Sequence, residues 1–283
     1  MDMYYAVGGG MGHLTRATAF FYTFNLDYNN FIIIVSAPHA GSVLKHKNYI
    51  TAPVEVIGNG ALLQQWLVQI VDKYNIENIY LDTFPAGLYG EWNNFTTLGK
   101  HQFFLISRLL NWGKYIGLMI SPPKFDVIYK FEELDKEQQT CYQKLSSEIL
   151  SKTLQYPPGP LPTEFSEFIN AAKNPVWLIV HSETAEEVLT LYNYARDVSQ
   201  AELITPTFAI VSQSVPESLQ KDIITYKFFP VYPCFEAVHK IFTACGFNSM
   251  QQTYNYRNKH VFIPFERKFD NQFLRAAYRK QLC

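Results

Sequence analysis

The sequence has little charge of either sign. Charged residues make up 17% of its 283 residues, and the formal net charge is -1. This balance does not indicate a nucleic-acid partner, because binding a polyanion needs an excess of clustered basic residues. Disorder is not indicated either, since apolar residues reach 48%. The composition is typical of a soluble enzyme.

Cysteine pairs and long apolar runs are also missing. The four cysteines form no Cys-x-x-Cys pair, so the sequence indicates neither a zinc site nor a disulfide framework and favours a reducing compartment. The N-terminus lacks the basic and apolar regions of a signal peptide. The segment 103–120 contains Arg108, Asn111 and Lys114, so it is not expected to span a bilayer. We expect a cytoplasmic protein and favour a buried strand and helix for this segment, with peripheral contact at the inner face of the membrane as the alternative.

Apolar runs alternate with segments of helical period, which predicts an α/β fold with parallel sheets. The run Tyr156–Pro162 contains four prolines, which can neither continue a helix nor lie in a central strand. We therefore expect two α/β domains, at 1–155 and 163–283. The expected strands lie at 3–7, 31–36, 54–57, 78–81, 103–106, 125–129, 176–180, 202–205, 208–211 and 261–263, and the expected helices include 61–74, 135–154, 184–195 and 234–243.

A glycine-rich turn, Gly8–Gly12, separates the first strand from a helix that begins near His13. The spacing is neither that of the dinucleotide fingerprint nor that of a Walker A loop. The turn lets the backbone approach a ligand, and the helix start offers free N–H donors. Its alternative role is tight packing of the strand against the helix. The helix dipole disfavours a charged His13, so this imidazole suits a general base.

Two further residues could act beside His13. Asp82 follows the strand 78–81, at the sheet edge where ligands bind in open α/β sheets. It could orient His13, contact an acceptor or cap the next turn. Arg16 faces either a phosphate or solvent, and solvent is the interpretation we favour.

A second glycine turn and helix start lie at Cys245–Gln252. A glycine turn with an Asn or Ser cap can bind a phosphate, and the amide and carboxylate groups of Asp270–Gln272 could bind hydroxyls. An ordinary helix cap is the alternative. Phosphate together with a polyol describes a sugar nucleotide.

The order of these motifs resembles GT-B glycosyltransferases. The matching residues are Gly8–His13, Asp82–Glu91, Gly246–Ser249, Pro264–Phe265 and Asp270–Gln272. Within that group, the sequence is most similar to the peptidoglycan N-acetylglucosaminyltransferase and to related predicted bacterial glycosyltransferases. The resemblance implies two Rossmann-like domains that face each other across a cleft, with the acceptor on the first and the nucleotide sugar on the second.

The resemblance also implies roles for individual residues. His13 would be the catalytic base, with Asp82 beside it, and Gln252 stands where the family commonly has a glutamate that holds the ribose. A neutral amide loses the charge assistance that makes such bonds roughly twice as strong. The acceptor-side loop would comprise Gly9, Gly10, Gly12 and Arg16, and the nucleotide-sugar site would comprise Gly246, Asn248, Ser249, Gln252, Arg267, Asp270 and Gln272.

The expected activity is inverting hexosyl transfer from a nucleotide-diphosphate sugar, with UDP as the family expectation, to a hydroxyl acceptor, for which a lipid- or glycan-linked hydroxyl is one candidate. No cofactor is expected, and the chain contains no Asp-x-Asp motif for a metal. Two alternatives stay open: a nucleotide-sugar epimerase of the same fold and a non-catalytic sugar-nucleotide-binding protein.

Overall fold

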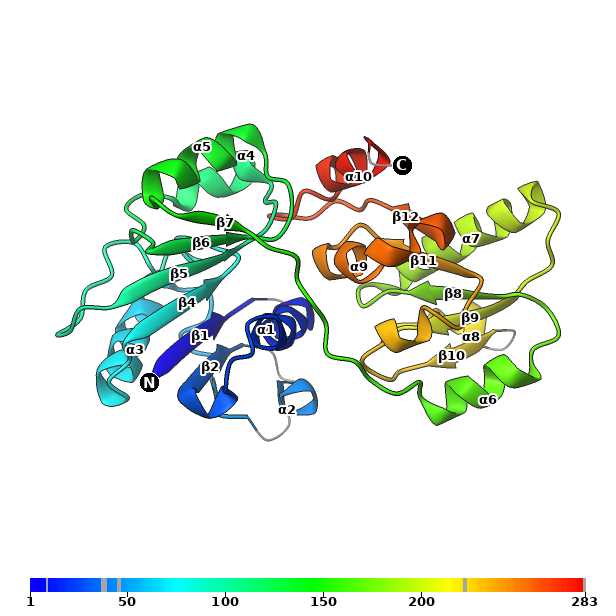
Figure 1. Ribbon diagram of the computed structural model, residues 1–283, viewed down its shortest axis with the longest axis horizontal. Coiled ribbons are helices and arrows are strands. Elements are labelled where there is room, and N and C mark those ends of the chain that lie inside the picture. Colours follow the sequence, from blue (N-terminus) through cyan, green and yellow to red (C-terminus); the bar gives the residue numbers. More distant parts are fainter. Residues whose placement is uncertain (9, 37–39, 45–46, 221–222, 282–283) are drawn as a thin grey trace. The chain divides into compact units, whose positions relative to one another are not determined.

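The computed structural model describes residues 1–8, 10–36, 40–44, 47–220 and 223–281 (Figure 1). The chain divides into two compact units. Unit 1 comprises Met1–Pro157 and Arg267–Asn271, and unit 2 comprises Pro158–Glu266 and Gln272–Cys283. The chain therefore passes from one unit to the other near the proline-rich segment and returns to unit 1 for five residues before its last helix.

Unit 1 contains a seven-stranded parallel sheet of order β3-β2-β1-β4-β5-β6-β7. Its strands are β1 Asp2–Ala6, β2 Phe31–Val35, β3 Tyr49–Thr51, β4 Asn78–Asp82, β5 Gln102–Ser107, β6 Val127–Lys130 and β7 Ile149–Ser151. Its helices are α1 Gly12–Thr23, α2 Ala40–Val43, α3 Gly60–Lys73, α4 Trp112–Tyr115 and α5 Lys136–Leu145.

Alternate residues of β1 pack into two cores, because successive side chains of a strand point to opposite faces. Met3 and Tyr5 join the apolar side chains of α3, α4 and α5 on one face. Tyr4 packs on the other face against Phe20 of α1, with ring centroids 5.6 Å apart. Burial on both faces explains why β2 is a continuous apolar run, all of it buried.

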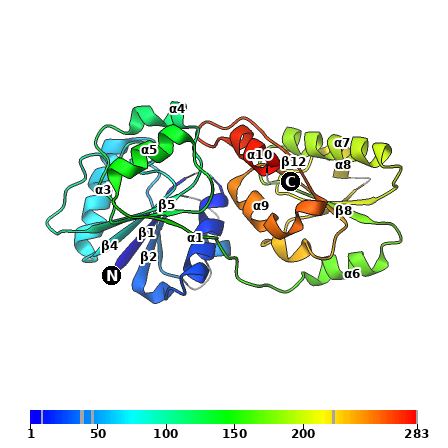
Figure 2. The ribbon, with the colours of Figure 1, turned by 45° about the horizontal axis from the view of Figure 1, so that its top comes forward.

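Unit 2 contains a five-stranded parallel sheet of order β10-β9-β8-β11-β12. Helices α6 and α7 lie on opposite faces of this sheet (Figure 2). The strands are β8 Val176–Val180, β9 Thr207–Val211, β10 Ile224–Tyr226, β11 Lys240–Ala244 and β12 His260–Ile263, and the helices are α6 Thr163–Ala171, α7 Ala185–Ala201, α8 Glu217–Gln220, α9 Phe247–Gln252 and α10 Gln272–Gln281. The predicted α/β class is confirmed.

Several predicted elements are wrong. Residues 54–57 form turns after Pro53, and Val54 is 85% exposed. The helix predicted at 135–154 ends at Leu145 and is followed by β7, while 234–243 contains only the last residue of a 3-10 helix, Tyr232–Cys234, and most of β11. Residues 202–205 form no strand. Segments as short as 54–57 and 202–205 fit both the strand period and the helix period. Pairing within the sheet decides which of them form strands.

None of the helices in the described part of the chain combines the length and apolarity needed to cross a bilayer. The segment expected either to be buried or to contact a membrane is mostly internal. Leu105, Trp112 and Tyr115 are buried, whereas Ile116 and Ile120 are 48% and 80% exposed.

Candidate functional site

The turn between β1 and α1 holds His13 against the backbone. Gly8 exchanges two 3.0 Å hydrogen bonds with the Ser36 hydroxyl, which accepts from its N–H and donates to its carbonyl. A Cβ atom at Gly8 would overlap the imidazole of His13. Gly10 has φ +79°, a conformation that favours glycine, and Gly12 begins α1. Gly9, also predicted for this loop, lies outside the described residues.

His13 and Asp82 meet at the carboxyl edge of the unit 1 sheet. The imidazole Nδ1 lies 2.6 Å from Asp82 Oδ2, and the two residues are 6% and 2% exposed. Because an ionised carboxylate can only accept, Nδ1 carries the proton of a neutral His13. The unprotonated Nε2 is then the nitrogen that can accept a proton.

Arg16, from the next turn of α1, adds a third side chain to His13 and Asp82. These three residues are called the His13 group below. Its Nε and Nη2 donate to the two oxygens of Asp82 at 2.5 and 2.7 Å. The expectation that Arg16 faces solvent is wrong, because only 2% of it is exposed. Paired donors of this kind fix the plane of a carboxylate as well as its charge.

Opposing effects set the charges in this group. Burial would raise the pKa of Asp82, but Arg16 and His13 lower it to about 2. Burial lowers the pKa of His13 below its ordinary 6.5, although Asp82 acts in the opposite direction. Near neutral pH the group therefore contains an ionised Asp82 and a neutral His13. The same protonation state was expected from the helix dipole, whereas the main cause here is burial.

Thr83 follows Asp82 in a strained backbone conformation. Its φ is +78°, and the amide of Phe84 donates to the carbonyl of Asp82 at 3.0 Å, which closes a three-residue γ-turn. A β-branched residue rarely adopts this conformation, so surrounding contacts must hold it. The Thr83 hydroxyl accepts from Arg16 Nη2 at 2.7 Å and from Arg108 Nε at 3.2 Å.

The rest of the Asp82–Glu91 segment is held by Glu91. This carboxylate is 1% exposed and accepts from the Tyr5 hydroxyl and the amides of Leu88 and Tyr89. A Cβ at Gly87 would overlap the carboxylate. Glu91 thus stabilises the loop that follows Asp82 and does not join the His13 group.

Four of the predicted donor-site residues lie together in unit 2, around α9. Gly246 caps this six-residue helix, Asn248 and Ser249 lie in its first turn, and Gln252 ends it. Two buried arginines of α10 support the turn: Arg275 donates to the carbonyl of Cys245 at 2.9 Å, and Arg279 donates to that of Met250 at 3.2 Å.

The other three predicted donor-site residues have different surroundings. Gln272 is 4% exposed, and its side-chain oxygen accepts from the amide of Phe265 at 3.0 Å. Arg267 and Asp270 belong to unit 1, where Asp270 forms an ion pair with Arg108 at 2.7 Å.

Sequence reasoning missed Thr83 and Arg108 as site residues. Arg108 comes just after β5, which pairs with β4, so adjacent strand ends could have indicated it. It also missed a histidine–carboxylate pair in unit 2, where His181 Nε2 lies 2.7 Å from Glu187 Oε2 at the carboxyl end of β8.

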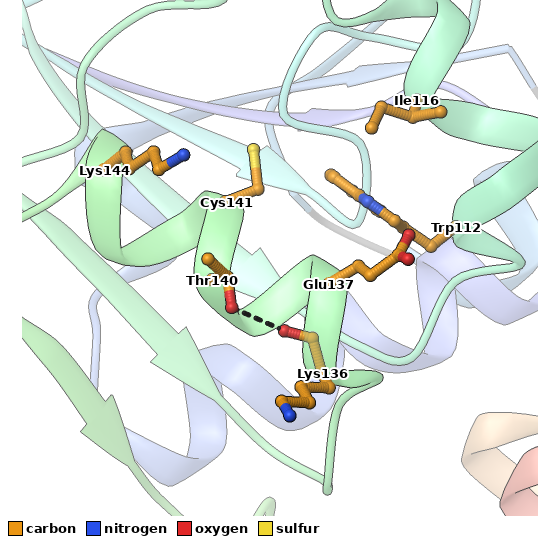
Figure 3. Close-up of a pocket in the computed structure, with 7 residues that line it drawn as sticks. All are labelled: Trp112, Ile116, Lys136, Glu137, Thr140, Cys141 and Lys144. Atoms are coloured by element: carbon orange, nitrogen blue, oxygen red, sulfur yellow. Dashed lines mark hydrogen bonds between the residues drawn. The ribbon is translucent and has the colours of Figure 1, made fainter.

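A surface hollow of about 520 Å³ lies between α4 and α5 in unit 1 (Figure 3). It shares no residue with the His13 group. The lining residues are Trp112, Ile116, Lys136, Glu137, Thr140, Cys141 and Lys144. Among the residues that the structure describes, no three His, Cys, Asp or Glu side chains come together as metal ligands.

No family model matches the sequence, and no curated protein matches it. Solved structures do resemble the fold. The glycosyltransferase SnogD from Streptomyces nogalater has a TM-score of 0.59 at 7% identity, covering 95% of this chain and 82% of its own. The co-structure of S. aureus MnaA with UDP has a TM-score of 0.66 at 8% identity, covering 95% and 80%. The UDP-N-acetylglucosamine 2-epimerase from Rickettsia bellii has a TM-score of 0.54 at 9% identity, also covering 95% and 80%. The fold is therefore that of GT-B glycosyltransferases and UDP-N-acetylglucosamine 2-epimerases.

Proposed function

We propose that the protein is an inverting glycosyltransferase that moves a hexose from a nucleotide-diphosphate sugar, with UDP as the expected nucleotide, to a hydroxyl acceptor. The observation that carries this proposal is the buried His13–Asp82 pair at a glycine turn, on the carboxyl edge of a GT-B sheet. Fold alone does not assign an activity, so the proposal rests on the chemistry of this pair.

His13 acts as the general base in this mechanism. Its Nε2 takes the proton of the acceptor hydroxyl while the hydroxyl oxygen bonds to the anomeric carbon. The bond from that carbon to the diphosphate breaks, and the electron pair leaves with the diphosphate. Asp82 holds the required tautomer through Nδ1 and stabilises the imidazolium that forms.

The state of Asp82 favours a single displacement. A retaining double displacement needs a carboxylate that is free to attack the sugar. Both oxygens of Asp82 are engaged by Arg16 and His13, and its pKa is lowered to about 2 against the effect of burial. These bonds make Asp82 an orienting group and a weak nucleophile.

The donor would bind to unit 2. We assign the diphosphate to the turn at Gly246 and the first turn of α9, with Asn248 and Ser249 as polar contacts and Gln252 near the ribose. Backbone amides at a helix start can stabilise the charge of a leaving diphosphate. We propose that transfer needs no divalent metal.

The first experiment is a thermal-shift screen of nucleotide diphosphates and their sugars, followed by transfer assays with a panel of hydroxyl acceptors. We expect stabilisation by a UDP-sugar, an inverted anomeric product, and full activity in EDTA. His13→Ala should lower kcat by about 10² to 10⁴, the usual contribution of a general base. The wild-type rate should fall only below pH 6.5, because His13 must be neutral and its pKa is lowered.

Normal transfer by His13→Ala would contradict the base assignment, and a retained anomer would contradict the single displacement. Loss of activity in EDTA would contradict metal independence. Donor binding without turnover on any acceptor would favour a non-catalytic sugar-nucleotide-binding protein.

A UDP-N-acetylglucosamine 2-epimerase is the second candidate, because an enzyme of that description shares the fold. Incubation with UDP-N-acetylglucosamine alone separates the two activities. Epimerised sugar nucleotide formed without an acceptor would contradict the transferase, whereas unchanged UDP-N-acetylglucosamine would contradict the epimerase.

A further inference from the structure

We propose that the returning segment Arg267–Asn271 is a functional part of the unit 1 site, where Asp270 acts through Arg108 and Thr83 to position His13 and Asp82. Asp270, Arg108 and Thr83 are then positioning residues. This inference rests on the proposed function only for its catalytic consequence, since the contacts themselves need no substrate.

Backbone and aromatic contacts fix the segment on unit 1. The amide of Asn111 donates to the carbonyl of Phe269 at 2.8 Å, and Leu110 forms an antiparallel bridge with Asp270. The Phe269 ring packs against Phe84 and Tyr115, with centroids 5.8 and 5.5 Å away. Phe84 also packs against the His13 ring at 5.9 Å. The segment therefore contacts the loop that carries Asp82 and Thr83.

A continuous set of polar contacts runs from this segment to the base. Asp270 Oδ1 accepts from Arg108 Nη1 at 2.7 Å, and both side chains are 12% exposed. Arg108 Nε donates to the Thr83 hydroxyl, which also accepts from Arg16 Nη2. The same Nη2 donates to Asp82, the partner of His13. Thr83 thus links the two arginines while its strained φ of +78° keeps its hydroxyl between them.

The charges in this set act on His13 in different directions. The charged groups that act on the imidazole are Asp82 from β4, Arg16 from α1 and Arg108 after β5. The buried Tyr4 lies beside Asp82 and Arg16. Burial is the largest cause of the lowered His13 pKa, Asp82 raises it, and Arg16 and Arg108 lower it further. Asp270 pairs with Arg108 and so offsets its positive charge. The ion pair thereby weakens the effect by which Arg108 lowers the His13 pKa.

This arrangement predicts that replacing Asp270 and replacing Arg108 shift the pKa of His13 in opposite directions. Asp270→Asn removes the negative charge that Asp270 places beside Arg108 and should lower the pKa of His13, whereas Arg108→Gln removes the positive charge and should raise it. A general loss of structure would not move the pKa in opposite directions. Titration of the labelled imidazoles by NMR, with His13→Gln to assign the signal, measures both shifts on the full chain without substrate.

Thr83 offers a matched pair of substitutions. Thr83→Val keeps the shape and β-branching but removes the hydroxyl acceptor, while Thr83→Ser keeps the hydroxyl. We expect Thr83→Val to lower kcat by at least about tenfold, with little change in the KM for the donor or the KM for the acceptor. Thr83→Ser should keep most of the wild-type kcat. Glu202→Gln, which breaks an ion pair with Lys240 within unit 2, is the control and should change neither the His13 pKa nor kcat.

Two results would overturn the inference. The first is that Asp270→Asn and Arg108→Gln leave the His13 pKa unchanged or move it in the same direction. The second is that Thr83→Val and Thr83→Ser have equal effects on kcat. If both pKa shifts occur as expected but no donor or acceptor is ever turned over, the proposed function fails while the positioning by Asp270 stands.

Discussion

Replacing Gly8 by alanine tests whether this glycine exists to make room for His13. The backbone of Gly8 is not in the left-handed region, so alanine can adopt its conformation. The obstacle is the imidazole, because the new Cβ would overlap the His13 ring. Overpacking of this kind costs about 1–3 kcal/mol in the free energy of unfolding. The ring must move to relieve the overlap, which weakens its 2.6 Å hydrogen bond to Asp82.

The effect on activity should exceed the effect on stability. A misplacement of about 1 Å in a reacting group can lower a rate about 10²-fold, so we expect Gly8→Ala to lower kcat by about that factor while the protein stays folded. Urea unfolding measures the stability change, and the transfer assay measures kcat. Gly117→Ala is the matched control, because a Cβ there meets no atom within 4 Å; it should change neither quantity.

A double-mutant cycle with His13→Ala identifies the cause. If the cost arises from the imidazole, Gly8→Ala should destabilise the His13→Ala background by less than about 0.5 kcal/mol, since the overlap is gone. An equal cost in both backgrounds would refute the reasoning, and so would a fully active and fully stable Gly8→Ala protein.

Three further predictions concern other parts of the molecule. Asp82→Asn should lower kcat at least about 10²-fold and destabilise the protein by about 3 kcal/mol, because it removes the carboxylate charge that offsets the buried Arg16 guanidinium; urea unfolding and transfer assays test this. Burial, together with Arg279, lowers the pKa of His260 to about 3. The unfolded chain therefore binds the extra proton first, and His260 should contribute a fall of about 2 kcal/mol in stability as the pH drops from 7 to 5, a contribution that His260→Gln should remove. If the α4–α5 surface contacts anionic membranes, wild-type protein should sediment with phosphatidylglycerol vesicles, and Lys136→Glu with Lys144→Glu should abolish this; equal sedimentation of both proteins would contradict that contact.

The sequence predicted the alternation of elements better than their ends. Buried runs such as Phe31–Val35 are bounded by turn residues and have one interpretation. The run 54–57 is three-quarters apolar but lies in turns, because Tyr49–Thr51 already pairs with β2 as the edge strand. Only the pairing of strands distant in the sequence decides such cases.

The sequence also indicated which residues lie at the sheet edge, but not how they pair. His13 and Asp82 were predicted there because each follows a strand. The burial of Arg16 and the bridging by Thr83 depend on side chains 66 and 67 residues apart along the chain, which no local pattern records. Asp270 was expected beside a sugar from its neighbours in sequence, whereas the structure shows it with Arg108 because five residues return to unit 1.

The two halves of the proposed site differ in how completely they are assembled without a ligand. In unit 1 the orientation of the base is already fixed, because Asp82 binds His13 with one oxygen and Arg16 with both. Such preorganisation means that little of the binding energy of a substrate is needed to form the catalytic group. In unit 2 the turn that we propose for the diphosphate precedes a helix of only six residues, which ends with the neutral Gln252, so no carboxylate from that position would strengthen the proposed ribose contact. From the proposed site we therefore expect weak donor binding, which steady-state kinetics would show as a high KM for the donor with a normal kcat.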